Sequence, residues 1–214
     1  MRLRPVQAVL VTLAFGAAAT ATISAAITFT STFKSLDAGS VSFAGKKVAA
    51  LVVSNDTSLR VAGEESLVRE LNSRGMQAVA TYRIAPKEEL QRSETARPWF
   101  ERANVDGVVV VRPVSAETRQ TYVPSLWVSP SYGTFWGYYG YSWSAVYVPG
   151  SGGVQTETAV VVETTIYSVP RDQLLWAAVS ETKNARDLGA FVQELVKETV
   201  EQMQKQGLAK SQPR

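Results

Sequence analysis

Three glutamates in the C-terminal half of the chain are the side chains best placed for acid–base chemistry. Glu157, Glu163 and Glu181 fall on segments that are predicted to form neighbouring strands. Two carboxyl groups that face each other across a cleft can hydrolyse a glycan, one as the acid and the other as base or nucleophile. The solvated face of a sheet gives polar residues the same spacing, so closeness alone does not indicate catalysis. Glycan processing by paired carboxylates such as Glu157 and Glu181 is therefore kept as the alternative hypothesis.

Two short segments match S-x-x-K, the serine–lysine arrangement of penicillin-recognising enzymes. They are Ser31-Thr32-Phe33-Lys34 and Ser180-Glu181-Thr182-Lys183. The S-D-N and K-T-G motifs that accompany the arrangement in those enzymes are missing. The sequence also has no histidine and no cysteine, which removes imidazole bases, thiolate nucleophiles and the usual zinc ligands. We expect no catalytic residue, no bound metal and no cofactor, and hence a protein that is not an enzyme.

The turn from Ser54 to Ser58 lies between a predicted strand and a predicted helix, where exposed amides attract anions. It has no glycine-rich fingerprint and no Walker lysine. Capping of the helix by Ser54, Asn55 or Asp56 explains these residues better than a phosphate site.

The most unusual segment is residues 122–149, which hold half of all the aromatic residues, with Gly133, Gly137 and Gly140 between them and no charged residue. Tyrosine and tryptophan give large rigid contacts with a polar edge, which favours a recognition surface for a protein or a glycan. Two other interpretations stay open: a satellite hydrophobic cluster, and insertion at a membrane surface. We predict an exposed contact surface. Its candidate binding residues are Trp127, Tyr132, Phe135, Trp136, Tyr138, Tyr139, Tyr141, Trp143 and Tyr147.

The N-terminus has the pattern of an export signal. Arg2 and Arg4 precede an apolar run from Val6 to Ala19, and small residues follow up to Ala26. Residues 1–26 are thus predicted to be a signal peptide or, if uncleaved, an N-terminal membrane anchor. Alanine stands where a bacterial lipoprotein would carry its lipidated cysteine.

Without Arg2 and Arg4 the 22 basic residues fall to 20 against 19 acidic ones, a balance that argues against nucleic acid as a partner.

The remaining chain predicts one α/β (α+β) domain with a mixed sheet. Residues 27–44 form an extended lead-in, residues 45–208 the domain, and residues 209–214 a polar tail. The element order is strand, helix, strand, helix, four strands and a final helix, with the helices packed mainly on one face. Pro98 is expected to end or kink the second helix. The predicted strands are 48–53, 78–82, 108–111, 115–122, 156–167 and 174–180, with the aromatic insert between the fourth and fifth.

Three stretches carry a resemblance to a known group: Lys47 to Val53, the helix end Leu71-Asn72-Ser73-Arg74-Gly75, and Val105 to Val110. Together they resemble the small α/β domain of bacterial envelope lipoproteins. That group includes the curli-secretion lipoprotein, the lipoprotein activator of penicillin-binding proteins and the TolB N-terminal domain. The resemblance implies a non-catalytic exported module that works by binding or assembling, and it transfers no functional residue.

Taken together, the sequence favours an exported envelope protein, periplasmic or held at the membrane by an uncleaved N-terminal segment. It is expected to bind or scaffold a partner through the aromatic insert. The partner would be an envelope protein, peptidoglycan or a membrane surface, and self-association into a homo-oligomer is left open. A membrane-inserting secretion accessory is a further alternative.

Overall fold

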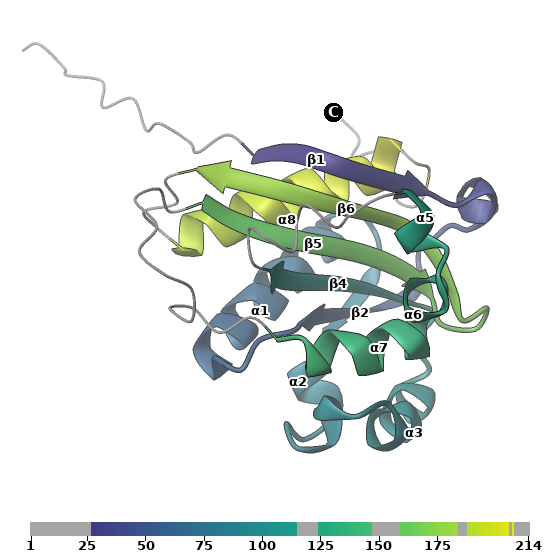
Figure 1. Ribbon diagram of the computed structural model, residues 1–214. Coiled ribbons are helices and arrows are strands. Elements are labelled where there is room, and N and C mark those ends of the chain that lie inside the picture. Colours follow the sequence, from purple (N-terminus) through teal and green to yellow (C-terminus); the bar gives the residue numbers. More distant parts are fainter. Residues whose placement is uncertain (1–26, 115–123, 147–158, 184–187, 206, 208–214) are drawn as a thin grey trace, which may run out of the picture.

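The computed structural model describes residues 27–114, 124–146, 159–183, 188–205 and 207 (Figure 1). Six strands form one mixed sheet in the order β1-β6-β5-β4-β2-β3. Strands β2, β3 and β4 run parallel, whereas β4, β5, β6 and β1 follow one another antiparallel. The strands are β1 (Ile27–Lys34), β2 (Lys47–Val52), β3 (Gln77–Ala80), β4 (Gly107–Val114), β5 (Ala159–Ser168) and β6 (Gln173–Lys183).

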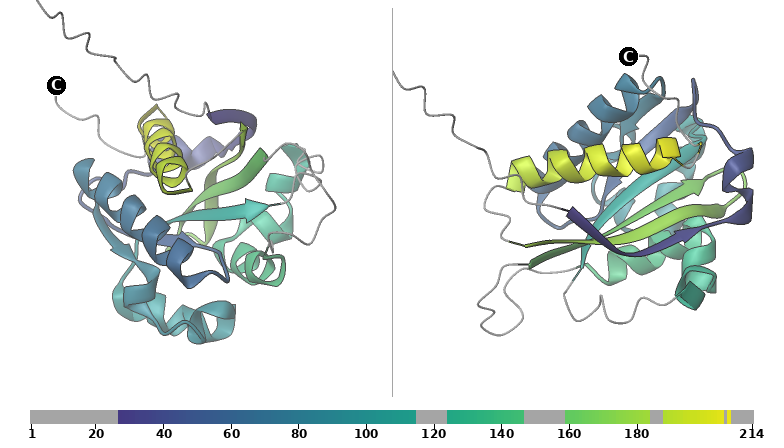
Figure 2. Two further views of the ribbon diagram at one scale, coloured as in Figure 1. Left: turned by 90° about the vertical axis from the view of Figure 1, so that its left-hand side faces the viewer. Right: turned by 90° about the horizontal axis from the view of Figure 1, so that it is seen from above.

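Helices cover the sheet on both faces, as the view from above in Figure 2 shows. Helices α1 (Thr57–Ser73) and α8 (Leu188–Lys205) pack on one face through Leu67, Leu71, Leu195 and Val200. The other face carries the shorter elements α2 (Thr81–Ile84), η2 (Glu89–Gln91), α3 (Ser93–Ala103), α5 (Pro124–Trp127), α6 (Pro130–Gly133) and α7 (Phe135–Ser144). The predicted α/β class and mixed sheet are confirmed. Helices α5, α6 and α7 of this second cover belong to the aromatic insert, which had been expected to form an exposed contact surface.

The central strands have the sequence of strands that are buried from both sides. Val48, Ala50 and Val52 of β2 face the core beneath α1 and α8, while Ala49 and Leu51 face the core beneath α7. A continuous apolar run suits such a strand because neither face meets water. This is why the first core strand could be recognised from the sequence.

Two local features differ from the sequence-based expectation, and a third cannot be compared. The N-terminal part of the predicted lead-in is extended, but it forms β1 and pairs antiparallel with β6; η1 (Leu36–Ser40) follows it. Pro98 lies inside α3 and does not end it, because Ala96 and Phe100 on its buried face hold the helix in the core. The strand predicted at 115–122 lies outside the described residues.

Glu64 stabilises the point where β3 leaves the sheet. Strand β3 ends at Ala80 opposite Ala50, so Val52 at the end of β2 has no partner on that side. The buried Glu64 Oε1 accepts from the Val52 amide (3.3 Å) and from the Thr81 hydroxyl (2.6 Å), and Oε2 accepts from the Tyr82 amide (2.9 Å). A carboxylate of α1 thus takes the place of a missing strand neighbour.

Within the described ranges, no helix is long and apolar enough to cross a bilayer.

Candidate functional site

The aromatic insert is folded into helices. Pro130 begins α6, where its missing N–H and fixed φ suit a first helical position. Thr134 caps α7 by accepting from the Gly137 amide at 3.1 Å. Gly137 has no side chain because a Cβ there would lie 2.6 Å from the carbonyl oxygen of Pro130. The close approach of α6 to α7 therefore depends on this glycine.

Most of the predicted contact residues belong to the core, which corrects the expectation of an exposed surface. Their rings pack edge to face and in tilted pairs against the sheet. The ring centroids of Trp136, Phe100 and Tyr139 lie 4.7 to 5.6 Å from that of Phe135. Only Trp136 and Tyr141 keep intermediate exposure, and Tyr147 lies outside the described residues. The buried members are Trp127, Tyr132, Phe135, Tyr138, Tyr139 and Trp143.

The hydroxyl groups of these rings explain how a tyrosine-rich segment can be buried, since each must find a partner when water is excluded. Tyr139 donates to the carbonyl oxygen of Leu90 at 2.7 Å, and Tyr167 on β5 donates to that of Tyr132 at 2.8 Å. Tyr132 and Tyr138 both donate to the Glu163 carboxylate, Tyr132 at 2.9 Å. Burial, and then the Glu163 charge, raise the pKa of Tyr138, so it stays a neutral donor.

Glu163 is also the partner of a buried arginine. Arg112 Nε lies 3.0 Å from Glu163 Oε1, and the two side chains are 1% and 0% exposed. Arg112 Nη1 donates to the carbonyl oxygen of Ala145 at the end of α7, and its guanidinium lies over the Tyr141 ring. This network ties α6 and α7 to β4 and β5. It gives Glu163 a structural role and removes it from the solvent-facing carboxylates that the alternative hypothesis requires.

Two of the other sequence-based candidates, Ser31 and Ser180, can be placed in the described structure. Ser31 and Lys34 sit three residues apart on β1, and such positions point to opposite faces of a strand. Ser180 is buried and donates to the carbonyl oxygen of Val162. Glu157 lies outside the described residues, so its pairing with Glu181 stays untested. Among the described residues no three His, Cys, Asp or Glu side chains come together as a metal site.

The capping prediction for the first strand-to-helix turn is confirmed. Asp56 Oδ1 accepts from the amides of Ser58 (2.8 Å) and Leu59 (3.1 Å), and Ser54 Oγ accepts from the Asp56 amide. The first turn of α1 is therefore satisfied by its own cap.

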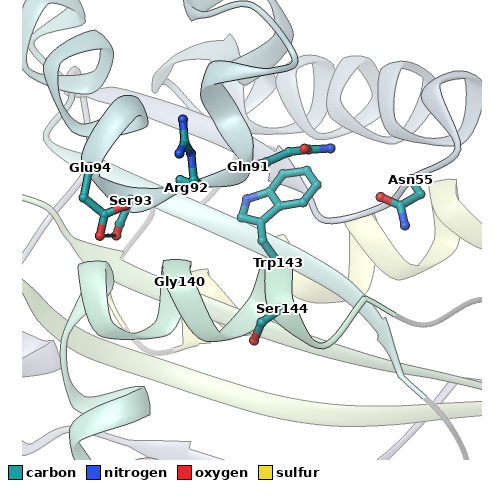
Figure 3. Close-up of a pocket in the computed structure, with 8 residues that line it drawn as sticks. All are labelled: Asn55, Gln91, Arg92, Ser93, Glu94, Gly140, Trp143 and Ser144. Atoms are coloured by element: carbon teal, nitrogen blue, oxygen red, sulfur yellow. Dashed lines mark hydrogen bonds between the residues drawn. The ribbon is translucent and has the colours of Figure 1, made fainter.

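A cleft opens beside this turn, between α7 and the start of α3 (Figure 3). Its volume is about 500 Å³, within the range of roughly 300–1,000 Å³ that is usual for small-ligand sites. The lining side chains are polar apart from one indole. They come from three separate segments: Asn55 after β2, Gln91, Arg92, Ser93 and Glu94 around the α3 start, and Gly140, Trp143 and Ser144 on α7.

The topology explains why the cleft forms at this place. Strand β2 is followed by α1, which packs on one face of the sheet. Strand β4 is followed by the helices that include α7, which packs on the opposite face. Adjacent parallel strands whose connections diverge in this way leave a crevice at their carboxyl ends, where α/β proteins commonly bind ligands. The sequence shows no such crevice, because its three walls are far apart along the chain.

The charges at the cleft belong to Arg92 and Glu94, and both side chains are exposed. Arg92 is the N-cap residue of α3 and its side chain makes no cap bond. The backbone amide of Glu94 itself and the Ser93 hydroxyl lower the pKa of the Glu94 carboxyl, which is therefore ionised and already hydrogen-bonded. The Trp143 indole N–H is buried next to the Tyr139 hydroxyl.

Comparisons with known proteins show a distant likeness only. No protein-family model matches the chain, and no curated protein matches it. A PelC dodecamer from Paraburkholderia phytofirmans has 14% identity and a TM-score of 0.42, over 86% of this chain and 97% of that one. A single-residue variant of the same protein has 14% identity and a TM-score of 0.45, over 87% and 99%. Lipoprotein GNA1162 from Neisseria meningitidis has 13% identity and a TM-score of 0.38, over 75% and 99%. The resemblance to the curli-secretion, penicillin-binding-protein-activator and TolB domains is not among these findings and stays a prediction.

Proposed function

We propose that this chain is an exported, non-catalytic envelope protein that binds an envelope component in the cleft between α7, the start of α3 and the turn that precedes α1. The observation that carries the proposal is the position of the cleft at the diverging carboxyl ends of β2 and β4. The export signal predicted for residues 1–26 supports an envelope location.

In this proposal the buried rings position the binding site and do not touch the ligand themselves. Phe135, Tyr138 and Tyr139 fix α7 on the sheet, so that Gly140, Trp143 and Ser144 face the cleft from a rigid helix. A site on a rigid element loses little conformational entropy when its ligand binds. The aromatic insert would thus act as the support of a binding site.

Two serines allow a matched test of the cleft. Ser144 is the exposed last residue of α7, lines the cleft, and donates to the carbonyl oxygen three residues earlier at 2.8 Å. Ser73 is the exposed last residue of α1 and makes the same kind of bond at 2.7 Å. An arginine at either position projects into solvent, but only the one at position 144 fills the cleft.

The test is co-sedimentation of the mature protein with purified peptidoglycan sacculi and with vesicles of envelope lipids. Ser144→Arg should lose the association that wild type shows, and Ser73→Arg should keep it. Equal sedimentation of all three proteins, or release of new reducing ends from the sacculi by wild type, would contradict the proposal. Fractionation of cells that express the full chain, with intact mass of the product, tests export and the fate of residues 1–26.

A further inference from the structure

Gly140 is a glycine of α7 that the fold itself does not require. Its φ is not positive, so its backbone conformation suits any residue. A Cβ at this position would meet nothing closer than the Ser93 Oγ at 3.9 Å, whereas a Cβ at Gly137 would lie 2.6 Å from the Pro130 carbonyl oxygen. A glycine inside a helix is less stable than an alanine. Neither conformation nor packing therefore explains Gly140.

The open space over Gly140 belongs to the cleft. Gly140 lines the cleft together with Trp143 and Ser144, which follow it by about one turn of α7. Figure 3 shows Gly140 and Trp143 on the side of α7 that faces the start of α3. Glycine is often found where a ligand approaches the backbone closely. A ligand that rests on this turn of α7 accounts for the missing side chain.

The rim of the cleft offers hydrogen-bond donors and acceptors together. The Asn55 and Gln91 amides and the Ser144 hydroxyl can each donate and accept. Arg92 only donates and Glu94 only accepts, and their opposite charges offset each other. An oxyanion would satisfy the donors alone, and an ammonium group the acceptors alone. The lining therefore favours an uncharged ligand whose groups both donate and accept, as hydroxyl groups do.

The floor of the cleft is apolar and small. The Trp143 indole N–H is buried beside the Tyr139 hydroxyl, so the part of the ring that reaches the cleft is carbon. A pyranose ring matches this arrangement, because it has a face of C–H groups and a rim of hydroxyls. A peptide backbone also donates and accepts, but binding pockets for apolar side chains have mostly apolar walls, and the described lining offers one indole.

We infer that the cleft binds an uncharged pyranose unit of an envelope glycan, with the sugar ring on Gly140 and Trp143 and its hydroxyls bonded to the polar rim. This inference rests on the proposed function for the location of the ligand, whereas the chemistry of the ligand follows from the lining residues. Gly140 then sets which ligands fit, since any side chain there would occupy the place of the sugar ring.

Four small molecules provide the probe. Glucose and N-acetylglucosamine are neutral pyranoses, glucuronate is a pyranose with a carboxylate, and sorbitol has hydroxyls like those of glucose but no ring. Each is titrated into ¹⁵N-labelled mature protein while the five tryptophan indole N–H signals are followed by NMR, with Trp143→Phe to assign the signal of Trp143. At least one neutral pyranose should shift the Trp143 signal and leave that of Trp176, on the opposite face of the sheet, unchanged.

The other two molecules test the shape and the charge of the ligand. Sorbitol should cause no such shift. Glucuronate should bind no more tightly than the tighter-binding neutral pyranose, because Arg92 and Glu94 offset each other. Equal shifts with sorbitol and the neutral pyranoses, tighter binding of glucuronate than of either neutral pyranose, or no shift with either neutral pyranose would overturn the inference.

Gly140→Ala separates binding from stability. Its methyl group takes the space of the sugar ring, so it should weaken binding of the neutral pyranose about fivefold or more. It should also raise the melting temperature, because alanine favours the helix and its Cβ meets no close neighbour. The control is Gly39→Ala, at an exposed glycine of η1 where a Cβ would meet nothing within 4 Å. That variant should bind the sugar normally.

Asn55→Ala, at an exposed position of the rim, should weaken binding about three- to tenfold. Unchanged sugar binding in both Gly140→Ala and Asn55→Ala would overturn the inference. Sugar binding that Gly140→Ala weakens, together with failed sedimentation, would contradict the proposed function alone. Sedimentation that depends on Ser144 without any sugar binding would contradict the sugar inference alone.

Discussion

Substitution by alanine should change the free energy of unfolding in opposite directions at two glycines of α7, Gly137 and Gly140. A Cβ at Gly137 would lie 2.6 Å from the Pro130 carbonyl oxygen and 2.8 Å from the capping Thr134 Oγ1. A Cβ at Gly140 would meet nothing closer than the Ser93 Oγ at 3.9 Å. Both residues lie in one helix, so the intrinsic helical gain from alanine, about 0.5–1 kcal/mol, is the same for both.

The expected magnitudes follow from these contacts. Gly140→Ala should raise the free energy of unfolding by about 0.5–1 kcal/mol. Gly137→Ala must displace backbone and disturb the cap, which costs about 1–3 kcal/mol for overpacking and about 1 kcal/mol for the cap, so the net effect should be a loss of about 1–3 kcal/mol.

Urea unfolding followed by far-UV circular dichroism measures both changes, with comparison of midpoints at a common slope. The result that would refute the reasoning is a gain in stability for both variants. Such a gain would mean that a Cβ at position 137 meets no other atom. The aromatic insert would then not pack on the sheet as described.

The remaining predictions concern the buried polar groups and one further contact. Glu163→Gln leaves Arg112 buried without its counter-charge and should cost about 3–5 kcal/mol in urea unfolding, whereas Glu101→Gln on the exposed side of α3 should change stability by less than about 0.5 kcal/mol. The raised pKa of Glu64 means that its protonated form favours the fold. Glu64 contributes its full share to the free energy of unfolding below pH 4.5, the ordinary pKa of the group. This share is lost as the pH rises through the raised pKa of the folded protein. Stability of wild type relative to Glu64→Gln should therefore fall with pH above 4.5, with a slope of at most about 1.4 kcal/mol per pH unit, and a constant difference from pH 4 to 8 would contradict the assignment. Gly107→Ala would bring a Cβ to 2.3 Å from the Phe43 ring and should cost about 1–3 kcal/mol, part of which Phe43→Leu should recover in the double variant if the clash is the cause.

The elements that could be predicted were those with a strong local signal. The apolar run of β2, the periodicity and cap of α1, and the β5–β6 hairpin carry their structure in consecutive residues, so they could be placed to within a few positions. β1 has polar residues at every second position and is an edge strand. Its pairing with β6 joins residues some 150 positions apart in sequence, which local patterns do not reveal.

The burial of the aromatic insert could not be predicted from the sequence. The many tyrosines and tryptophans suggested an exposed contact surface, and no residue close to the insert in sequence indicated the partners of its hydroxyl groups. Glu163 and Arg112 supply those partners from two strands of the sheet. Tertiary contacts therefore determined how the aromatic insert packs.

The central claim is that the cleft is where this protein meets the envelope. A photo-reactive amino acid in place of Ser144, with a matched protein carrying it at Ser73, tests this in living bacterial cells. We predict that irradiation yields an adduct with an envelope component from position 144 and none from position 73. Adducts of equal yield from both positions, or none from position 144 in protein confirmed to be exported and folded, would contradict the account.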